Sequence, residues 1–193
     1  MRPIAFIVVN YGSTHLLRDN LVTSAQDCRP EHVVVVDNRS TDAEREKVRG
    51  LCAAEGWELV ESPDNRGFGG GMNAGVSRAR ELGAEDFLLL NPDAVIGADA
   101  LAVLRRHARA SRDTVFAPRI VDGEGRTWFA GSDLYLSDGL TMGAAKRHLR
   151  PDEERWEWLT GACILVPDAA WDLAGGFDED YFLYWEDVDF SRR

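Results

Sequence analysis

Short apolar runs recur through the first half of the chain, separated by stretches in which apolar residues are spaced further apart. Residues 4–9 and 33–36 are continuous apolar runs, as is typical of strands covered on both faces. Residues 57–61 form a weaker run of the same kind, and residues 86–90 form a fourth. The pattern therefore predicts four short, buried strands.

The intervening stretches have the spacing of helices. Leu17, Leu21, Ser24 and Cys28 fall on one helical stripe. Thr41 and Glu44 have the spacing of a capping box that opens a helix to about Ala54. Two further helices are expected, one running to Leu82 after a Gly-rich loop at residues 65–71 and one at residues 100–110. Repeated strand–helix–strand units predict an α/β, Rossmann-like fold, with a mostly parallel central sheet and helices on both faces.

The alternation weakens after about residue 114. Residues 116–129 predict a hairpin, and residues 130–155, rich in Gly, Ser and charge, predict a mobile loop. A strand is expected at residues 159–166 and a helix at residues 184–193.

The chain contains no clear linker, so we interpret residues 1–193 as a single domain. Within it, residues 1–112 and residues 113–193 would form two halves. The last expected helix reaches Arg193 without a C-cap, which predicts that the second half is truncated.

Charge and composition narrow the possible functions. The net charge of −11 argues against a nucleic-acid-binding protein with a basic face. It also means that a phosphorylated ligand needs a metal ion or backbone N–H donors to be held. The 3 cysteines lack C-x-x-C spacing and are expected to be reduced thiols. No apolar run is long enough for a signal peptide or a membrane span, so we expect a cytoplasmic protein, with a place at the inner face of the membrane left open.

Several polar groups follow the expected strands directly. Asn10, Asp37, the Gly-rich loop and Asp93 each come just after a strand. Because ligands of parallel α/β sheets bind at the carboxyl ends of the strands, this shared position predicts a ligand site. Asp37 could accept hydrogen bonds from a ribose or a pyrimidine, although Asp-Asn-x-Ser also favours a turn.

The Gly-rich loop lacks the third glycine of a dinucleotide fingerprint and follows the third strand rather than the first. It could still let the backbone approach a ligand, with the following helix offering N–H groups to an anion. A flexible structural turn is the alternative. Residues 91–93, Asn-Pro-Asp, could supply a carboxylate to a metal bridging two phosphates, or form a turn.

Carboxylates and aromatic residues gather near the end of the chain. Asp187 is the candidate general base, with Glu186 as the next candidate. Trp185 and Tyr184 could form a stacking wall for a sugar. The alternative is that these acids stabilise the start of a helix through its dipole.

Taken in order, these motifs resemble the family-2 glycosyltransferases of GT-A fold, especially the rhamnosyltransferase-like branch. The resemblance covers nearly the whole chain, and it implies that residues 1–112 form a nucleotide-sugar-binding half and residues 113–193 an acceptor-side half. It rests on residues 7–11, 36–42, 65–69 with Asn73, 90–93, 159–162, 175–178 and 182–187.

The resemblance implies an inverting transfer of a sugar, with rhamnose as one candidate, from a dTDP- or UDP-sugar donor with Mg²⁺ or Mn²⁺. The acceptor would be a glycan, a lipid-linked or a small molecule, in bacterial cell-wall or polysaccharide biosynthesis. It also implies roles for individual residues. The nucleoside pocket would be lined by Val9, Tyr11 and Asp37, and the nucleotide and sugar would lie along Asn65, Arg66, Gly67 and Asn73. The metal would be bound by Asp93, the donor sugar would lie over Gly161 and Ala162, the base would be Asp187, and the remaining binding residues would be Asn10, Asn91 and Trp185. The sequence departs from the family where Asn91 stands in place of a common acid, which puts the strength of metal dependence in question.

Two other functions are consistent with the same pattern. A nucleotidyltransferase would share the sheet type but carry a Gly-rich basic loop after the first strand, where this chain has Asn10-Tyr11-Gly12-Ser13-Thr14. A non-catalytic nucleotide-binding domain is the second alternative, since the fold alone does not determine function.

Overall fold

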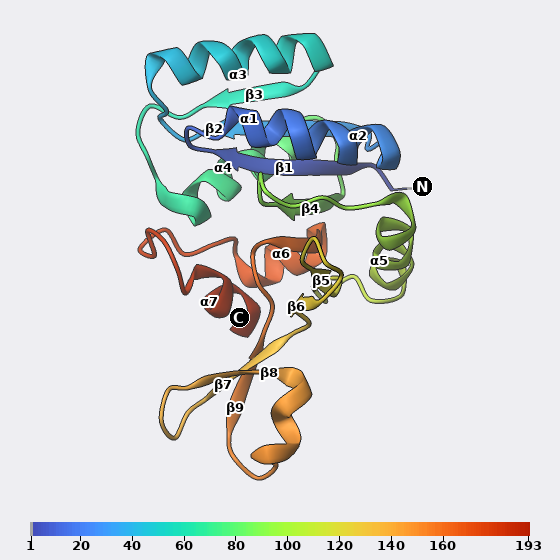
Figure 1. The fold of residues 1–193 in the computed structure, drawn as a ribbon, viewed down its shortest axis with the longest axis vertical. Coiled ribbons are helices and arrows are strands. Elements are labelled where there is room, and N and C mark those ends of the chain that lie inside the picture. Colours follow the sequence, from blue (N-terminus) through green and yellow to red (C-terminus); the bar gives the residue numbers. More distant parts are fainter. Residues whose placement is uncertain (1) are drawn as a thin grey trace.

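A five-stranded sheet forms the centre of the molecule, in a computed structural model that describes residues 2–193. The strand order is β10-β4-β1-β2-β3, and β1 to β4 run parallel while β10 is antiparallel to β4 (Figure 1). The strands are β1 (Ile4–Asn10), β2 (His32–Asp37), β3 (Glu58–Glu61), β4 (Asp86–Leu90) and β10 (Cys163–Pro167). The mostly parallel sheet predicted from the sequence is thereby confirmed.

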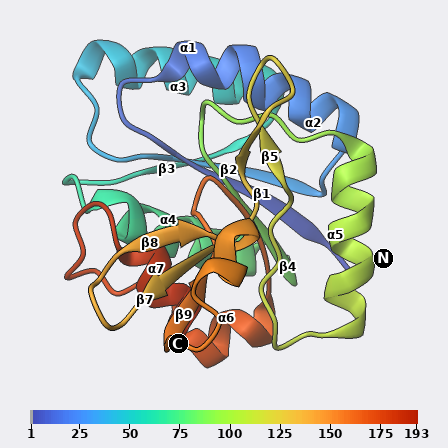
Figure 2. The same cartoon turned by 60° about the horizontal axis from the view of Figure 1, so that its bottom comes forward.

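Helices cover both faces of this sheet, as Figures 1 and 2 show. One face carries α1 (Thr14–Leu16), η1 (Leu17–Leu21) and α2 (Val22–Cys28), which follow one another directly, with α3 (Asp42–Glu55) and α5 (Ala98–Ala110). The other face carries α4 (Gly67–Glu81), α6 (Asp168–Ala174) and α7 (Glu186–Arg192). Among residues 2–193, no helix combines the length and apolarity needed to cross a bilayer.

The central strands are apolar throughout because both of their faces are covered. In β1, Ile4, Phe6 and Val8 pack into the core on the α3 and α5 side, whereas Ala5 and Ile7 pack against α4. All of these residues are fully buried. Side chains alternate across a strand, so a continuous apolar run is what two packed faces require.

The Gly-rich run is helical, which corrects the loop expected at residues 65–71. The α4 helix begins at Gly67 and includes the later glycines of the run. A methyl group on Gly71 would lie 2.8 Å from Val9 Cγ2, and one on Gly75 would lie 2.4 Å from Ile7 Cγ2. The glycines are present because α4 lies too close to β1 for side chains, and this proximity outweighs their low helix propensity.

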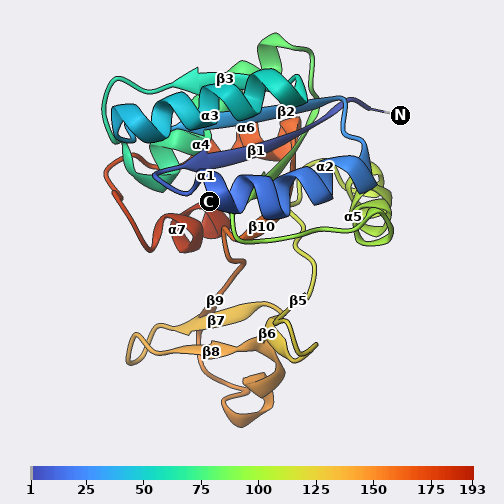
Figure 3. The same ribbon diagram turned by 45° about the horizontal axis from the view of Figure 1, so that its top comes forward.

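Residues 130–155 are also ordered differently from the predicted mobile loop. They contain β7 (Ser132–Tyr135), β8 (Thr141–Gly143), the 3-10 helix η2 (Ala144–Leu149) and the start of β9 (Arg155–Trp158). These strands form a separate three-stranded sheet, β8-β7-β9, which projects from the body of the molecule (Figure 3).

Ion pairs, rather than a long apolar run, organise this small sheet. The Asp133 carboxylate is fully buried, accepts from Arg147 at 2.7 Å and lies 3.6 Å from Arg155. The guanidinium of Arg150 lies 4.2 Å from the centre of the buried Tyr135 ring. A reading based on hydrophobic periodicity misses such a sheet because its order comes from charged partners far apart in the sequence.

The remaining elements are close to their predicted places. The hairpin is present as β5 (Ile120–Val121) and β6 (Thr127–Phe129). The strand expected at residues 159–166 begins later, at Cys163, and α6 was not predicted at all. The last helix starts at Glu186 rather than at Tyr184, since Tyr184 and Trp185 have φ angles of 68° and 72°, which a right-handed helix cannot include.

Candidate active site

The carboxyl ends of β1 and β4 and the start of α4 enclose a pocket of about 370 Å³. The segment before α7 supplies its remaining wall. Residues lining it include Val9, Tyr11, Asn38, Asn65, Gly67, Asn91, Asp93, Phe182 and Leu183. Six of the residues implied by the family resemblance are thus brought together, from parts of the chain more than 80 residues apart.

Asn38 organises the turn that leads into α4. Its side-chain nitrogen donates to Asn65 Oδ1 and to the Gly67 carbonyl, both at 2.8 Å. Its Oδ1 accepts from the Arg66 backbone N–H at 3.1 Å. Sequence reasoning gave Asn38 no role of its own, and its position directly after a buried strand was the only signal for one.

Asn10 and Asp37 lie beneath the pocket rather than on its wall, and both are fully buried. Asp37 Oδ2 accepts from Arg45 Nε at 2.9 Å and from the Ser40 N–H at 3.3 Å. Asn10 Oδ1 accepts from the Ser13 N–H at 3.1 Å. These contacts shape the two turns that follow β1 and β2.

Arg66 and Asn73 contact the segment that precedes α7. The Asn73 amide donates to the Phe177 carbonyl and accepts from the Phe177 N–H, each at 2.9 Å. Both Asn73 and Arg66 also bond the Glu179 carboxylate. These two side chains therefore bind the segment before α7, and neither lines the pocket at the strand ends.

The first N–H groups of α4 already have partners within the protein. The Gly67 N–H donates to Asn65 Oδ1 at 3.0 Å, and the Phe68 N–H donates to the Phe182 carbonyl at 3.2 Å. These donors are consequently engaged at the point where the sequence suggested an anion site. Because these donors are occupied and the chain has a net charge of −11, a diphosphate bound here would need a cation to neutralise it.

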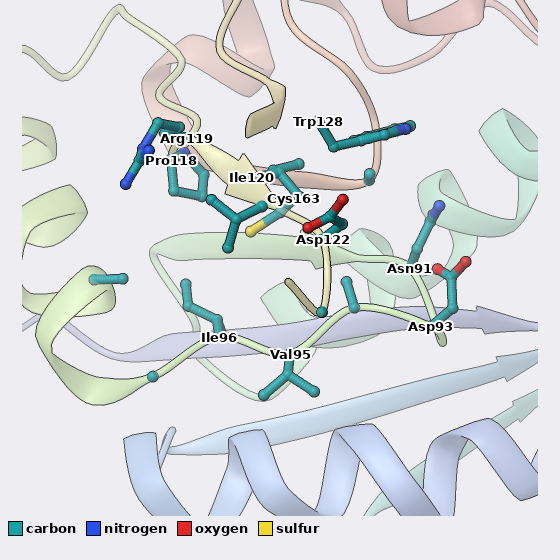
Figure 4. A pocket seen from close by; sticks show the side chains of 16 residues that line it. Asn91, Asp93, Val95, Ile96, Pro118, Arg119, Ile120, Asp122, Trp128 and Cys163 are labelled. Carbon is teal, nitrogen blue, oxygen red and sulfur yellow. The ribbon is translucent and has the colours of Figure 1, made fainter. Parts of the chain in front are cut away.

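Asp93 is exposed in the loop after β4. Figure 4 shows it beside Asn91 at one end of a neighbouring cavity of about 740 Å³, with Trp128 across from them. Within residues 2–193, no hydrogen bond or ion pair engages the Asp93 carboxylate, and no group of three or more His, Cys, Asp or Glu side chains forms a metal cage. One free carboxylate beside an amide fits a divalent cation that takes most of its ligands from substrate phosphates.

Asp187 lies at the start of α7 and is tied to the strand ends by a backbone contact. Its Oδ2 accepts from the Gly161 N–H at 3.0 Å, and its Oδ1 accepts from the Val188 N–H at 2.9 Å. Burial raises the pKa of the Asp187 carboxyl, and these two hydrogen bonds offset only part of that effect. A carboxylate with a raised pKa is a stronger base than an ordinary Asp.

A short turn before β10 joins the Asp187 and Asp93 sides of the site. Gly161 donates to Asp187, and the carbonyl of Ala162 accepts from the Asn91 N–H at 2.9 Å. There is no room for a side chain at Gly161, because a methyl group there would lie 2.9 Å from Phe68 Cε1. Adjacent residues therefore hold the candidate base and the backbone of Asn91, two residues before the candidate metal ligand Asp93.

Glu186 and Trp185 border a second pocket, of about 310 Å³, which also includes Asp187. Glu186 is 6% exposed, and burial, followed by the charge of Asp187, raises the pKa of its carboxyl. Trp158 and Thr160 line the same pocket. Sequence reasoning missed these two, since nothing local distinguishes them before the small sheet is folded against α7.

Comparisons with known proteins show the family of the chain. The family model described as "Glycosyl transferase family 2" matches residues 5–165. The chain is 26% identical over 197 residues to the low-salt glycan biosynthesis hexosyltransferase Agl10 of Haloferax volcanii, covering 98% of this chain and 61% of that protein. It is 27% identical over 215 residues to the N-acetylglucosaminyl-diphospho-decaprenol L-rhamnosyltransferase of Mycobacterium tuberculosis, covering 99% of this chain and 69% of that one.

Solved structures show the same fold at low identity. The mannosyltransferase PcManGT from Pyrobaculum calidifontis, in complex with GDP-Man and Mn²⁺, superposes with a TM-score of 0.67 at 20% identity, over 99% of this chain and 51% of that chain. S. aureus TarS 1-349 in complex with UDP-GlcNAc superposes with a TM-score of 0.67 at 20% identity, over 98% of this chain and 52% of that chain. This chain thus spans about half the length of these two structures. The resemblance to this family, inferred above from the motifs, is confirmed, and the similarity extends to an L-rhamnosyltransferase. By its sequence and its GT-A fold, the chain belongs to glycosyl transferase family 2.

Proposed function

We propose that this protein transfers a sugar from a nucleotide-diphosphate sugar to an acceptor hydroxyl, with inversion at the anomeric carbon. The single observation that carries the proposal is the turn at Gly161 and Ala162. One residue of this turn holds the Asp187 carboxylate and the next holds the Asn91 backbone beside Asp93. A base and a site for the leaving diphosphate are thus fixed on the two sides of one short segment.

The donor lies in the pocket at the strand ends in this proposal. Tyr11, 63% exposed, offers a ring face for the nucleoside, and Val9 lies beneath it. Asp37 supports this wall from below through its contacts with Arg45 and Ser40. The L-rhamnosyltransferase among the relatives makes rhamnose one candidate for the sugar. The family resemblance makes dTDP and UDP the candidate nucleotides, and one TarS structure holds UDP.

Asp93, with Asn91 beside it, would hold a divalent cation, Mg²⁺ or Mn²⁺. When bound, such an ion neutralises the diphosphate and stabilises it as a leaving group. Support comes from the free Asp93 carboxylate and from the shortage of other cationic or N–H groups at the pocket. Two of the structural relatives were solved with Mn²⁺.

Asp187 would act as the general base. The acceptor oxygen attacks the anomeric carbon, the bond from that carbon to the diphosphate breaks, and the hydroxyl proton passes to Asp187. Attack opposite the leaving group in one step gives the inverted configuration. The Gly161 contact fixes the carboxylate while burial raises its proton affinity.

Nucleotide binding tests the donor half of this proposal. UDP, dTDP and GDP should each be compared in thermal unfolding with Mn²⁺ and with EDTA. We expect one of them with Mn²⁺ to stabilise the protein, by about 2.7 kcal/mol at 100 times its Kd, and to lose most of that effect in EDTA. Asp93→Asn should abolish the metal effect, whereas Asp113→Asn, which alters an exposed carboxylate outside the pocket, should keep it. Stronger stabilisation by NAD than by every nucleotide diphosphate would contradict the proposal.

The pH dependence of turnover tests the base. Burial raises the pKa of Asp187 above that of an ordinary Asp, and the protonated acid cannot accept a proton. Turnover should therefore fall as the pH drops through this raised value, clearly above the ordinary pKa of about 3.9. The measurement is nucleotide release from the donor as a function of pH, and Glu186→Gln should retain the same acid limb. If turnover instead falls at the pKa of an ordinary Asp, the general base is a residue other than Asp187.

A further inference from the structure

Two buried polar atoms without partners belong to residues that line one pocket. Among residues 2–193, Trp158 Nε1 and Glu186 Oε2 are both buried and make no hydrogen bond. Both residues border the pocket of about 310 Å³ beside Asp187. An unpaired buried donor or acceptor is costly to the fold, so its presence calls for a group that the protein itself does not supply.

The two residues come from different parts of the molecule. Trp158 ends β9 of the projecting sheet, where its ring packs against Phe129 at a centroid distance of 5.4 Å. Glu186 is the first residue of α7. A buried donor and a buried acceptor therefore belong to residues that line one pocket, one from β9 and one from α7, with Asp187 next to Glu186.

Tyr184 and Trp185 form the outer wall of the pocket. They are 73% and 49% exposed, and both have left-handed backbone conformations that are strained for residues other than glycine. Glu186 Oε2 and Trp158 Nε1 are closed off from solvent, so a ligand that reaches them must displace side chains that line the pocket. The strained backbone at Tyr184 and Trp185 makes this segment the candidate to move.

We propose that this pocket is the acceptor site and that it takes a saccharide, whose hydroxyl groups accept a hydrogen bond from Trp158 Nε1 and donate one to Glu186 Oε2. This inference rests on the proposed function, in which Asp187 receives the proton of the attacking hydroxyl. Trp158 and Glu186 would select the acceptor, while Asp187 carries out the chemistry.

The chemistry of the pocket favours a sugar over an apolar chain. A hydrocarbon would leave both the indole N–H and the carboxyl oxygen unpaired. A hydroxyl group both donates and accepts, so neighbouring hydroxyls of one ring can satisfy the two groups together. The C–H face of the ring can pack on Trp185, whose large apolar surface is half exposed.

The indole N–H of Trp158 gives a direct test by NMR. The protein has 6 tryptophans, and Trp158→Phe identifies the signal of interest by its loss. Methyl glycosides of rhamnose, mannose, galactose, glucose and N-acetylglucosamine should be added to the ¹⁵N-labelled protein in turn. At least one should shift the Trp158 signal to saturation, while the exposed Trp128 signal stays in place. The fully O-methylated form of that glycoside keeps the ring but has no hydroxyl donors, and it should produce no shift.

Variants separate recognition from structure. Trp158→Phe and Glu186→Leu should each weaken binding of that glycoside by about 3- to 10-fold, the loss of one hydrogen bond. The two atoms that these variants remove, Trp158 Nε1 and Glu186 Oε2, make no internal hydrogen bond within residues 2–193, so both variants should remain folded, which their unfolding midpoints check. Trp128→Phe is the matched control and should bind normally. Two results would overturn the inference. One is binding of the glycoside by Trp158→Phe with wild-type affinity, and the other is a Trp158 signal that no glycoside shifts.

Failure of the inference is distinguishable from failure of the proposed function. Stabilisation by a nucleotide with Mn²⁺ depends on the pocket at the strand ends, whose lining does not include Trp158 or Glu186. Nucleotide stabilisation without a Trp158 shift would retain the proposed function and reject the acceptor site. A Trp158 shift without nucleotide binding would leave a saccharide site and reject the transferase.

Discussion

Asp187→Asn is expected to lower sugar transfer by about 10²–10⁴-fold while leaving nucleotide binding intact. The side chain keeps its size, and its oxygen can still accept from the Gly161 N–H. What is lost is the ability to take a proton from the acceptor. Transfer should be measured from donor to acceptor, and nucleotide affinity from thermal stabilisation with Mn²⁺.

Stability gives this variant a second readout. The folded-state pKa of Asp187 is raised, so the carboxyl favours folding at low pH, and that contribution is lost as the pH rises through the folded value. An Asn cannot ionise and can accept only one of the two N–H groups that Asp187 binds, so the variant should lose this pH dependence, and its stability relative to the native protein should rise as the pH rises through the folded value. Asp189→Asn, on the same helix but paired with Arg193 at 2.7 Å, is the matched control and should keep its activity. Near-native transfer by Asp187→Asn would assign Asp187 to helix capping and make Glu186 the next residue to test.

Gly67→Ala is expected to destabilise the protein by about 2–5 kcal/mol and to reduce both nucleotide binding and transfer. Gly67 has a φ angle of 71°, and an added methyl carbon would lie 1.9 Å from the Phe182 carbonyl oxygen. The segment before α7 would have to move, together with the pocket wall that Phe182 and Leu183 form. Urea denaturation measures the loss of stability.

Gly56→Ala is the matched control for this prediction. Gly56 has nearly the same φ angle, 70°, but open space where a methyl group would lie. It therefore reports the conformational cost alone, about 1–2 kcal/mol. The difference between the two variants measures the contact with Phe182. Equal losses of stability would show that the segment before α7 accommodates the methyl group without cost.

The sequence alone determined the central sheet and the position of the pocket at the strand ends. The strands β1, β2 and β4 consist mostly of consecutive apolar residues, so both faces of the sheet must be covered by other elements. Once these strands are parallel, their carboxyl ends lie at one edge. Asn91 and Asp93 must then lie near Val9 and Tyr11, and the structure places all four at one pocket.

Local pattern was misleading where tertiary contacts override propensity. A run of glycines reads as a loop, yet the proximity of Val9 and Ile7 makes glycine the residue that lets α4 pack there. The small sheet reads as a mobile segment, because its order depends on the buried Asp133 and its arginine partners. Neither cause is visible in a window of neighbouring residues.

The details of the site were decided only by the tertiary structure. The sequence placed Arg66 and Asn73 in a motif, but the fold turns them toward Glu179 and Phe177. It also brings Trp158, from the projecting sheet, into one pocket with Glu186 and Asp187. The reason is physical: hydrophobic burial fixes where the backbone runs, whereas the partner of a polar side chain depends on which distant group arrives within about 3 Å of it.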